Sequence, residues 1–586
     1  MVVETALLFE GVSKTFQADN RTVTALKNVD VRIEPGKVTG LIGPDGAGKT
    51  TLMRLAAGLM MPDTGQVQVL GIDVIRHPLK VQSSVGYMPQ NFGLYEDLSV
   101  QENLDLYADL QGVAKTDRPD RYQELMRMTG LAPFNRRLAG RLSGGMKQKL
   151  GLACTLVGAP HLLLLDEPTV GVDPVSRREL WAIVYRQVQE RNMTVFLSTA
   201  YLDEARHCDT VVLLNEGQLL GEDSPDAFSK PMQGRTFRVT APGISKRSLQ
   251  TSLAEVPGII DAVIEGEQVR IVTASPGTPD LSGVETNDSK PELQPAEPIF
   301  EDAFVAALKR DRPFEKLQHA RFISRTPGTE QKHGAIIEVR NLQRRFGDFY
   351  AVKNISFNVQ QGEIFGLLGA NGAGKTTTFR MLCGLLPLSA GEVKVAGLDL
   401  RYAPAQARGR LGYMAQRFSL YVNLSVIQNL RFFARAYGLD RLHGKQRVDW
   451  ALETFGLTGY AHANSRELPL GYKQRLAMAA ALLHEPDILF LDEPTSGVDP
   501  LARRDFWQRI NALAESGVTV LVTTHFMDEA NYCDRVVIMA EGDILIEDTP
   551  AGMKANFRDA ANPDPTMEDA FIKLIENHEK RKGKAA

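Results

Sequence analysis

Features that are rare in this chain exclude several classes of protein. The 586 residues include only four cysteines and no CxxC pair, which argues against a disulfide scaffold and against a zinc or iron–sulfur site. A formal net charge of -4 argues against a surface built to hold nucleic acid, since that requires a strong basic excess. We therefore expect a folded protein of a reducing compartment, with no nucleic-acid partner.

Long apolar runs are also missing. No window approaches the roughly 18–20 uninterrupted apolar residues of a membrane helix, so we expect a chain that does not span a bilayer. The opening residues, MVVETALLFEG, contain no basic stretch followed by an apolar run, which argues against a signal peptide. A chain of 586 residues is too long for one hydrophobic core, and several domains are expected.

The chain contains the same series of segments twice. GPDGAGKTT begins at Gly43 and GANGAGKTT at Gly369, and the same spacing relates GYMPQ to GYMAQ and LLLLDEPTVGVDP to ILFLDEPTSGVDP. Each copy alternates strand-like and helix-like stretches and has a helix-rich insertion, at about 95–160 and 421–486. This order predicts two tandem α/β domains, each a mostly parallel sheet flanked by helices with a helical subdomain.

The two copies differ in length after a shared EGxxLxED segment. The extra residues of the first half include TFRVTAP, GIIDAVIEG and QVRIVTA, which alternate like strands, and the helix-like SLQTSLAEV. They predict a small βαββ module, followed by a Pro-, Ser- and acid-rich flexible linker with a short helix. The predicted divisions are a first α/β domain 1–235, the module 236–274, the linker 275–334, a second α/β domain 335–555, and a C-terminal helix with a basic tail 556–586.

Both glycine-rich segments fit the pattern GxxxxGK[ST] between a strand-like run and a helix-like segment. Glycines let successive N–H groups turn toward phosphate oxygens, and the helix N-terminus adds the positive end of its dipole. The lysine would reach the β- and γ-phosphates, and the first threonine would bind Mg²⁺. The predicted loop residues are Gly43, Pro44, Asp45, Gly46, Ala47, Gly48, Lys49, Thr50 and Thr51 in the first copy and Gly369, Ala370, Asn371, Gly372, Ala373, Gly374, Lys375, Thr376 and Thr377 in the second.

An acidic pair ends a strand-like run in each copy, Asp166 with Glu167 and Asp492 with Glu493. A carboxylate at the C-terminal edge of a strand is suited to the Mg²⁺ shell, and the next one can orient or deprotonate an attacking water. Acidic pairs at strand ends are also common as caps or solvated turns. The phosphate loop upstream favours the catalytic interpretation.

The order of these segments resembles the nucleotide-binding domain of ATP-binding-cassette (ABC) proteins. The resemblance rests on the phosphate loop, GYMPQ, LSGGMKQKL, LLLLDEPT, GVDP and STxxxDEA, and covers about 5–235 and 335–555. It implies an ATPase of the P-loop fold that binds ATP and Mg²⁺. In that family two domains pair head to tail, and each ATP lies between the phosphate loop of one domain and the signature of the other.

The resemblance assigns further residues. Phe16 and Phe346 would stack on adenine, where a tyrosine is more usual, although a core position for either phenylalanine stays open. A glutamine after each GYMxQ would sense the γ-phosphate. Gln90 and Gln416 would have that role and would also bind Mg²⁺, together with Thr50, Asp166, Thr376 and Asp492. The signature that contacts ATP in trans would be Ser143, Gly144, Gly145 and Gly471. The catalytic residues would be Glu167, Glu493 and His525.

Two departures from the family pattern fall on one implied site. Ala200 stands where the second copy has His525, and LPLGY replaces LSGGM with Pro469 and Leu470. Pro469 removes a hydroxyl and an N–H, and Leu470 places a branched side chain where glycine would admit phosphate. In a head-to-tail pair both changes act on the ATP of the first loop. We expect the first site to hold its ATP for a long time while the second site hydrolyses ATP. The alternative is that both changes are neutral and both sites turn over.

The expected partners follow from the same resemblance. The chain is similar to fused tandem ATPases of ABC-2-type exporters, thought to serve drug efflux, which implies two separate integral-membrane permease subunits. It would then be peripheral, on the cytoplasmic face of the inner membrane, with permease helices received near Tyr95 and Tyr421 unless these are core aromatics. Two alternatives stay open: the ATPase of an importer, and a soluble tandem ABC translation factor on ribosomes, which would be expected to show a charged helical linker and a basic surface.

Overall fold

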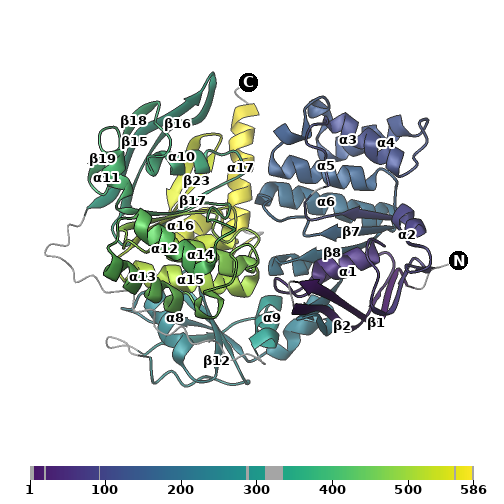
Figure 1. Cartoon of the computed structure of the whole chain (residues 1–586), viewed down its shortest axis with the longest axis horizontal. Coiled ribbons are helices and arrows are strands. Elements are labelled where there is room, and N and C mark those ends of the chain that lie inside the picture. The colour runs from purple at the N-terminus through teal and green to yellow at the C-terminus, as the bar shows by residue number, and fades with distance from the viewer. Residues whose placement is uncertain are drawn as a thin grey trace. The chain divides into compact units, whose positions relative to one another are not determined.

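The structure, a computed structural model, describes residues 5–18, 21–91, 93–284, 290–309, 334–559 and 562–583 (Figure 1). By their contacts, the described residues form two compact units. The first unit contains the described residues within Met1–Gln233, Glu297–Asp311 and Asp499–Leu501. The second unit contains the described residues within Gly234–Ala296, Arg312–Val498 and Ala502–Ala586.

A six-stranded sheet forms the centre of the first domain, in the order β10-β9-β3-β8-β7-β6. Neighbouring strands are parallel except β9 and β10, which are antiparallel. The predicted mostly parallel sheet is therefore confirmed. The strands are β3 (Val38–Ile42), β6 (Val85–Met88), β7 (Leu162–Asp166), β8 (Thr194–Thr199), β9 (Thr210–Asn215) and β10 (Gln218–Asp223).

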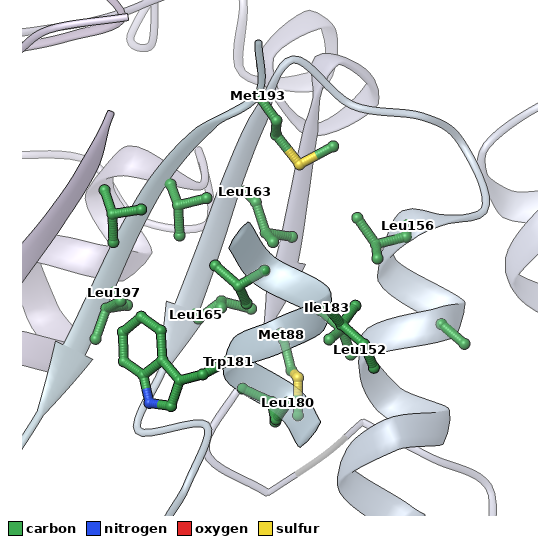
Figure 2. Packing of buried hydrophobic residues seen from close by; sticks show 14 of the residues in the cluster. Met88, Leu152, Leu156, Leu163, Leu165, Leu180, Trp181, Ile183, Met193 and Leu197 are labelled. Atoms are coloured by element: carbon green, nitrogen blue, oxygen red, sulfur yellow. The ribbon is translucent and has the colours of Figure 1, made fainter. Parts of the chain in front are cut away.

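Two hydrophobic cores cover the two faces of this sheet. Successive side chains of a strand point to opposite faces, so Leu162 and Leu164 of β7 pack in the core that includes α1, whereas Leu163 and Leu165 pack in the core that includes α5 and α6. Figure 2 shows part of the second core, including Leu163, Leu165 and Trp181. The helices are α1 (Lys49–Ala56), α2 (Pro78–Ser84), α3 (Val100–Leu110), α4 (Arg118–Thr129), α5 (Gly144–Leu156), α6 (Pro174–Arg191) and α7 (Pro225–Ser229).

A four-stranded antiparallel sheet, β2-β1-β4-β5, completes the first domain and carries Phe16. Its strands are β1 (Leu7–Ala18), β2 (Arg21–Ile33), β4 (Thr64–Val69) and β5 (Ile72–Asp73). Short 3-10 turns connect the other elements: η1 (Ala132–Phe134), η2 (Ala139–Arg141), η3 (Leu202–His207) and η4 (Lys230–Met232). Helices α3, α4 and α5 lie within the predicted helix-rich stretch.

The second domain repeats both sheets, in the orders β20-β21-β22-β17-β23-β24 and β16-β15-β18-β19. Its strands are β15 (Ala335–Phe346), β16 (Phe349–Gln360), β17 (Ile364–Gly369), β18 (Ala390–Val395), β19 (Leu398–Asp399), β20 (Leu411–Met414), β21 (Ile488–Asp492), β22 (Thr519–Thr524), β23 (Arg535–Ala540) and β24 (Asp543–Asp548). Its helices are α10 (Lys375–Leu382), α11 (Pro404–Arg408), α12 (Val426–Ala436), α13 (Arg441–Thr454), η5 (Thr458–Tyr460), α14 (Leu470–Ala481), α15 (Pro500–Glu515), η6 (Met527–Tyr532), α16 (Pro550–Ala555) and α17 (Met567–Gly583).

The module between the domains is a four-stranded antiparallel sheet with one helix. Its elements are β11 (Thr236–Thr240), α8 (Lys246–Glu255), β12 (Ile259–Glu265), β13 (Gln268–Thr273) and β14 (Glu292–Pro295). Strand β14 lies in the segment predicted to be a flexible linker, and there the prediction is wrong because its backbone pairs with β11. Other parts of that linker, 285–289 and 310–333, lie outside the described residues.

Helix α9 (Phe300–Lys309) returns to the first domain, where Phe300, Phe304 and Val305 enter the core that includes α5 and α6. Its counterpart α17 buries Ala570 and Phe571 and contacts η6 of the second domain. Among the described helices, none combines the length and the apolar character required to cross a membrane.

Candidate functional site

The glycine-rich loop of each half joins a buried strand to a helix, β3 to α1 and β17 to α10. Gly48 and Gly374 end these loops with φ of 103°, a region that L side chains rarely adopt. A Cβ at Gly48 would lie 2.4 Å from the carbonyl oxygen of Ala25, and one at Gly374 would lie 2.6 Å from that of Ala351. Glycine is therefore required at both positions by backbone conformation and by space.

A buried lysine folds back over each loop. Lys49 Nζ donates to the carbonyl oxygens of Gly43 at 2.8 Å and Pro44 at 3.1 Å, and Lys375 makes matching bonds of 2.7 and 3.1 Å. Both lysines are 5% exposed. Each ammonium also faces a glutamate carboxylate, Lys49 that of Glu167 at 3.7 Å and Lys375 that of Glu493 at 3.9 Å. The loops therefore hold a cation where a phosphate oxygen can approach.

The aspartate that ends β7 or β21 lies next to the first threonine of the loop. Asp166 Oδ1 accepts a hydrogen bond from Thr50 at 3.3 Å, and Asp492 Oδ1 accepts one from Thr376 at 3.5 Å. Asp166 Oδ2 is buried and has no hydrogen-bond partner within the described ranges. A carboxylate and a hydroxyl are the hard oxygen ligands that Mg²⁺ takes beside phosphate, so these residues fit that ion.

The next residue of each copy, Glu167 or Glu493, has an unusual backbone conformation. Their φ angles are 50° and 46°, in the left-handed region, which costs of order 1–3 kcal/mol for a non-glycine residue. The amide of Glu167 donates to the carbonyl of Ser198 at 3.1 Å, and that of Glu493 donates to the carbonyl of Thr523 at 3.0 Å. These bonds fix the turn that directs each carboxylate toward the loop lysine.

A glutamine after β6 or β20 contacts the same carboxylate. Gln90 Nε2 donates to Glu167 Oε2 at 2.5 Å, and Gln416 Nε2 donates to Glu493 Oε2 at 2.7 Å. The structure therefore brings together, in each half, the loop lysine, the threonine, the acidic pair and the glutamine that the sequence singled out.

Comparisons with known proteins agree with this geometry. The family model described as "ABC transporter" matches residues 26–170 and 352–496. The chain is 50% identical over 583 residues to "Probable multidrug ABC transporter ATP-binding protein YbhF" of Escherichia coli (strain K12), covering 98% of this chain and 99% of that protein. This chain is a member of the ABC transporter family. It is an ABC ATPase with two tandem ATP-binding domains.

Other relatives cover less or are more distant. A "Putative ABC transporter ATP-binding protein" of Methanosarcina mazei is 28% identical over 92% of this chain and 88% of its own length. "Nod factor export ATP-binding protein I" of Cupriavidus metallidurans is 42% identical over 37% of this chain and 72% of its own length. A solved structure described as "Structure of ATP binding subunit of ABC transporter" is 28% identical, with a TM-score of 0.38, and covers 41% of this chain and 99% of that chain.

The two ATP-binding domains of this ABC ATPase differ beside the glutamate. His525 Nδ1 lies 3.2 Å from Glu493 Oε2, whereas the equivalent position of the first domain is the buried Ala200. Burial acts to raise the pKa of Glu493, but contacts with His525 and Lys375 outweigh it and lower that pKa. Burial raises the pKa of Glu167, against the opposing charge of its lysine. The carboxylate facing the histidine therefore favours its ionised form more strongly.

The signature segments begin equivalent helices with different caps. Ser143 is the N-cap of α5, and its hydroxyl accepts a hydrogen bond from the amide of Met146 at 3.3 Å. Pro469 is the N-cap of α14 and makes no side-chain capping bond. At Gly145 a Cβ would lie 2.4 Å from Ser176 Oγ, so this signature glycine is also required by packing within its own domain.

The predicted adenine-stacking residues are exposed on the antiparallel sheets. Phe16 is 37% exposed and Phe346 is 46% exposed, so neither is a core phenylalanine. Arg344 lies over the Phe346 ring, 4.5 Å from its centroid. Exposed rings on these strands are available for stacking, and their role with adenine stays a prediction.

The sequence did not single out one pair of hydroxyl residues. Ser198 Oγ donates to Asp166 Oδ1 at 2.6 Å, and Thr523 Oγ1 donates to Asp492 Oδ1 at 2.7 Å. Each hydroxyl also accepts a hydrogen bond from a glutamate amide, Ser198 from Glu167 at 3.0 Å and Thr523 from Glu493 at 2.9 Å. The available signal was a hydroxyl residue recurring two positions before Ala200 and His525 in both copies.

Proposed function

We propose that this chain is the ATP-hydrolysing subunit of an exporter whose permease subunits are separate chains, and that drugs or other xenobiotics are its cargo. Two relatives named for multidrug transport and for Nod factor export support this proposal. Such a subunit would work at the cytoplasmic face of the inner membrane, bound through its permeases.

The two ATP sites would divide the work, with hydrolysis at the second. The observation that carries this is the 3.2 Å contact between His525 and Glu493, which the first domain replaces with Ala200. By family resemblance, the halves would pair head to tail, so that Pro469 and its neighbours would face the ATP of the first loop. Loss of one preorganised donor to a developing oxyanion typically costs about 10²–10³ in rate. The first site would then bind ATP and turn it over very slowly.

The residues of the second site suggest a role for each group. The ammonium of Lys375 would bind phosphate oxygens in place of its present carbonyl partners. Thr376 and Asp492 would hold Mg²⁺, which neutralises phosphate charge when bound. Glu493 would accept the proton of the attacking water, and its lowered pKa keeps it ionised for that role. Gln416, which holds the same carboxylate, would orient that water.

The division of work is tested by removing one glutamate at a time. In the full-length chain, ATP turnover of Glu493→Gln is expected to fall by about 10²–10³-fold. The matched Glu167→Gln is expected to change turnover by less than about threefold, since the first site contributes little. Both variants should bind ATP as the unchanged chain does. A larger loss for Glu167→Gln would reverse the assignment, and undiminished turnover in both variants would contradict hydrolysis at these sites.

The surface that would receive permease helices contains an exposed aromatic residue in each half. Tyr95 is 57% exposed and Tyr421 is 50% exposed, so both lie outside the core. Each follows the glutamine of its site, and its backbone is hydrogen-bonded to Asn103 or Asn429 of the next helix, at 3.0 Å in both. A permease helix bound there would contact the segment that leads to the γ-phosphate sensor.

Purification distinguishes this proposal from the alternatives. The chain purified from membranes in detergent is expected to retain integral-membrane proteins, and Tyr95→Ala combined with Tyr421→Ala is expected to release them. Retention of permeases by the double variant would exclude this surface. Sedimentation with ribosomes, without membrane proteins, would overturn the exporter and support a translation factor.

A further inference from the structure

A buried carboxylate supports the histidine of the second domain from behind. Glu529 lies on η6, just after β22, and is 2% exposed. Its Oε2 accepts a hydrogen bond of 2.6 Å from the hydroxyl of Thr524, the residue before His525. The same hydroxyl accepts a bond of 2.9 Å from the amide of Phe526, the residue after it. Both chain neighbours of the histidine are therefore fixed through one side chain.

The other oxygen of this carboxylate holds a different loop. Glu529 Oε1 accepts a hydrogen bond from the hydroxyl of Thr495, two residues after Glu493. The pairing of β21 with β22 ends at Asp492 and Thr523, followed by one further backbone bond from the amide of Glu493 to the carbonyl of Thr523, and β22 pairs with β17 as far as Thr524. Glu529 continues the connection past the end of the sheet. It ties the segment after the glutamate to the segment that carries the histidine.

The first domain has the same carboxylate but a different second contact. Glu204 Oε2 accepts a hydrogen bond of 2.6 Å from Thr199, which precedes Ala200. Its Oε1 accepts a bond of 3.3 Å from the indole of Trp181 on α6. The half that has Ala200 in place of this histidine thus ties the strand to helix α6 through Glu204, and the chain supplies its own matched control.

We propose that Glu529 is a positioning residue of the second ATP site, which holds His525 against Glu493 without touching the nucleotide. Displacement of a reacting group by about 1 Å can lower the rate of hydrolysis about 10²-fold. A carboxylate that fixes both loops can therefore affect this rate without contacting the nucleotide. Arg503 Nε lies 3.8 Å from Glu529 Oε1 and adds charge to the same connection. This inference rests on the proposed hydrolysis at the second site.

The experiment compares Glu529→Gln with Glu204→Gln in the full-length chain. Glutamine keeps the shape but can accept through one oxygen, so one of the two threonine bonds is lost. For Glu529→Gln we expect kcat to fall about tenfold while KM for ATP changes less than about twofold, as for a group that acts in the transition state. Glu204→Gln should leave kcat within about twofold.

A double-mutant cycle with His525→Ala separates positioning from general stability. If Glu529 acts through the histidine, adding Glu529→Gln to His525→Ala costs little further turnover. A further tenfold loss in that background, or equal losses for Glu529→Gln and Glu204→Gln, would overturn the inference. Thr495→Val removes a single hydroxyl and replaces Glu529→Gln in the cycle should the glutamine variant fail to fold. The proposed function fails by a separate result, undiminished turnover in Glu493→Gln.

Discussion

At the residue scale, two equivalent glutamates have nearly the same neighbours and opposite pKa shifts. Glu167 and Glu493 share a left-handed backbone, a glutamine donor and a buried lysine. The imidazole of His525 beside Glu493 is replaced by the methyl group of Ala200, and the pKa of the first glutamate is raised where that of the second is lowered. The imidazole accounts for the lowered pKa of Glu493, and a second difference lies near Glu167, where the first loop has Asp45 in place of Asn371.

Glu204 offers a test of burial at this scale. Its carboxyl is 1% exposed, and burial raises its pKa to about 7. The raised pKa stabilises the fold fully below the unfolded value of about 4.5, and that contribution is lost as pH rises through about 7. Relative to Glu204→Gln, the unchanged chain should lose roughly 3 kcal/mol between pH 5 and pH 8.

The measurement is the unfolding midpoint of both proteins at the two pH values. Glutamine also loses one hydrogen bond, but that cost is the same at every pH and cancels in the comparison. A difference between the two proteins that stays constant with pH would show that Glu204 does not titrate in this range.

At the element scale, the signature helices α5 and α14 begin differently. A serine N-cap satisfies one of the free amides in the first turn of α5, whereas Pro469 leaves the first turn of α14 without a side-chain partner. Pro469 in place of a serine therefore weakens the start of this helix.

Removal of the serine cap should loosen the first turn of α5. Ser143→Ala is expected to cost about 1 kcal/mol locally, which corresponds to about fivefold faster hydrogen exchange at the amide of Met146. Pro469→Ala serves as the matched control, because no capping bond is lost, and should change exchange in α14 by less than about twofold. Equal effects at the two helices would show that the Ser143 bond contributes nothing in solution.

At the scale of the whole molecule, the module follows the first domain in sequence but belongs by its contacts to the second unit. Asp261 of β12 forms a buried ion pair with Arg504 of α15, and Arg247 of α8 pairs with Asp534 beside β23. Gln250 of α8 accepts a hydrogen bond of 2.9 Å from Asn511. The side chains of Arg504 and Asp261 are only 10% and 4% exposed, and this burial lowers the pKa of Arg504 to about 10.

The buried pair should be the main electrostatic bond between the module and the second domain. Asp261→Ala takes its carboxylate away from a buried guanidinium and is expected to destabilise the second unit by about 3–5 kcal/mol. Glu265→Ala on the same strand breaks a half-exposed pair with Arg238 and should cost less than about 1 kcal/mol. Calorimetry of the full chain reports both, and equal costs would contradict a buried contact at Arg504.

The sequence by itself determined much of this protein, because duplicated motifs are local. The phosphate loops, the acidic pairs, the glutamines and the missing histidine were visible as spacing and residue type, and so was the α/β class. The role of a glycine with positive φ, or of a lysine at the start of a helix, is set by the few residues next to it in sequence. These assignments depended on short segments whose chemistry is set by their own residues.

Tertiary structure decided what depends on residues distant in sequence. Nothing in ELQP predicted that Glu292–Pro295 would pair with β11, because an edge strand is selected by the backbone beside it. The module's place with the second unit rests on single charges such as Asp261 and Arg504, far apart in the chain. The second contact of Glu204 or Glu529 likewise depends on which side chain approaches from another element. Such choices are made by packing, which residue spacing does not encode.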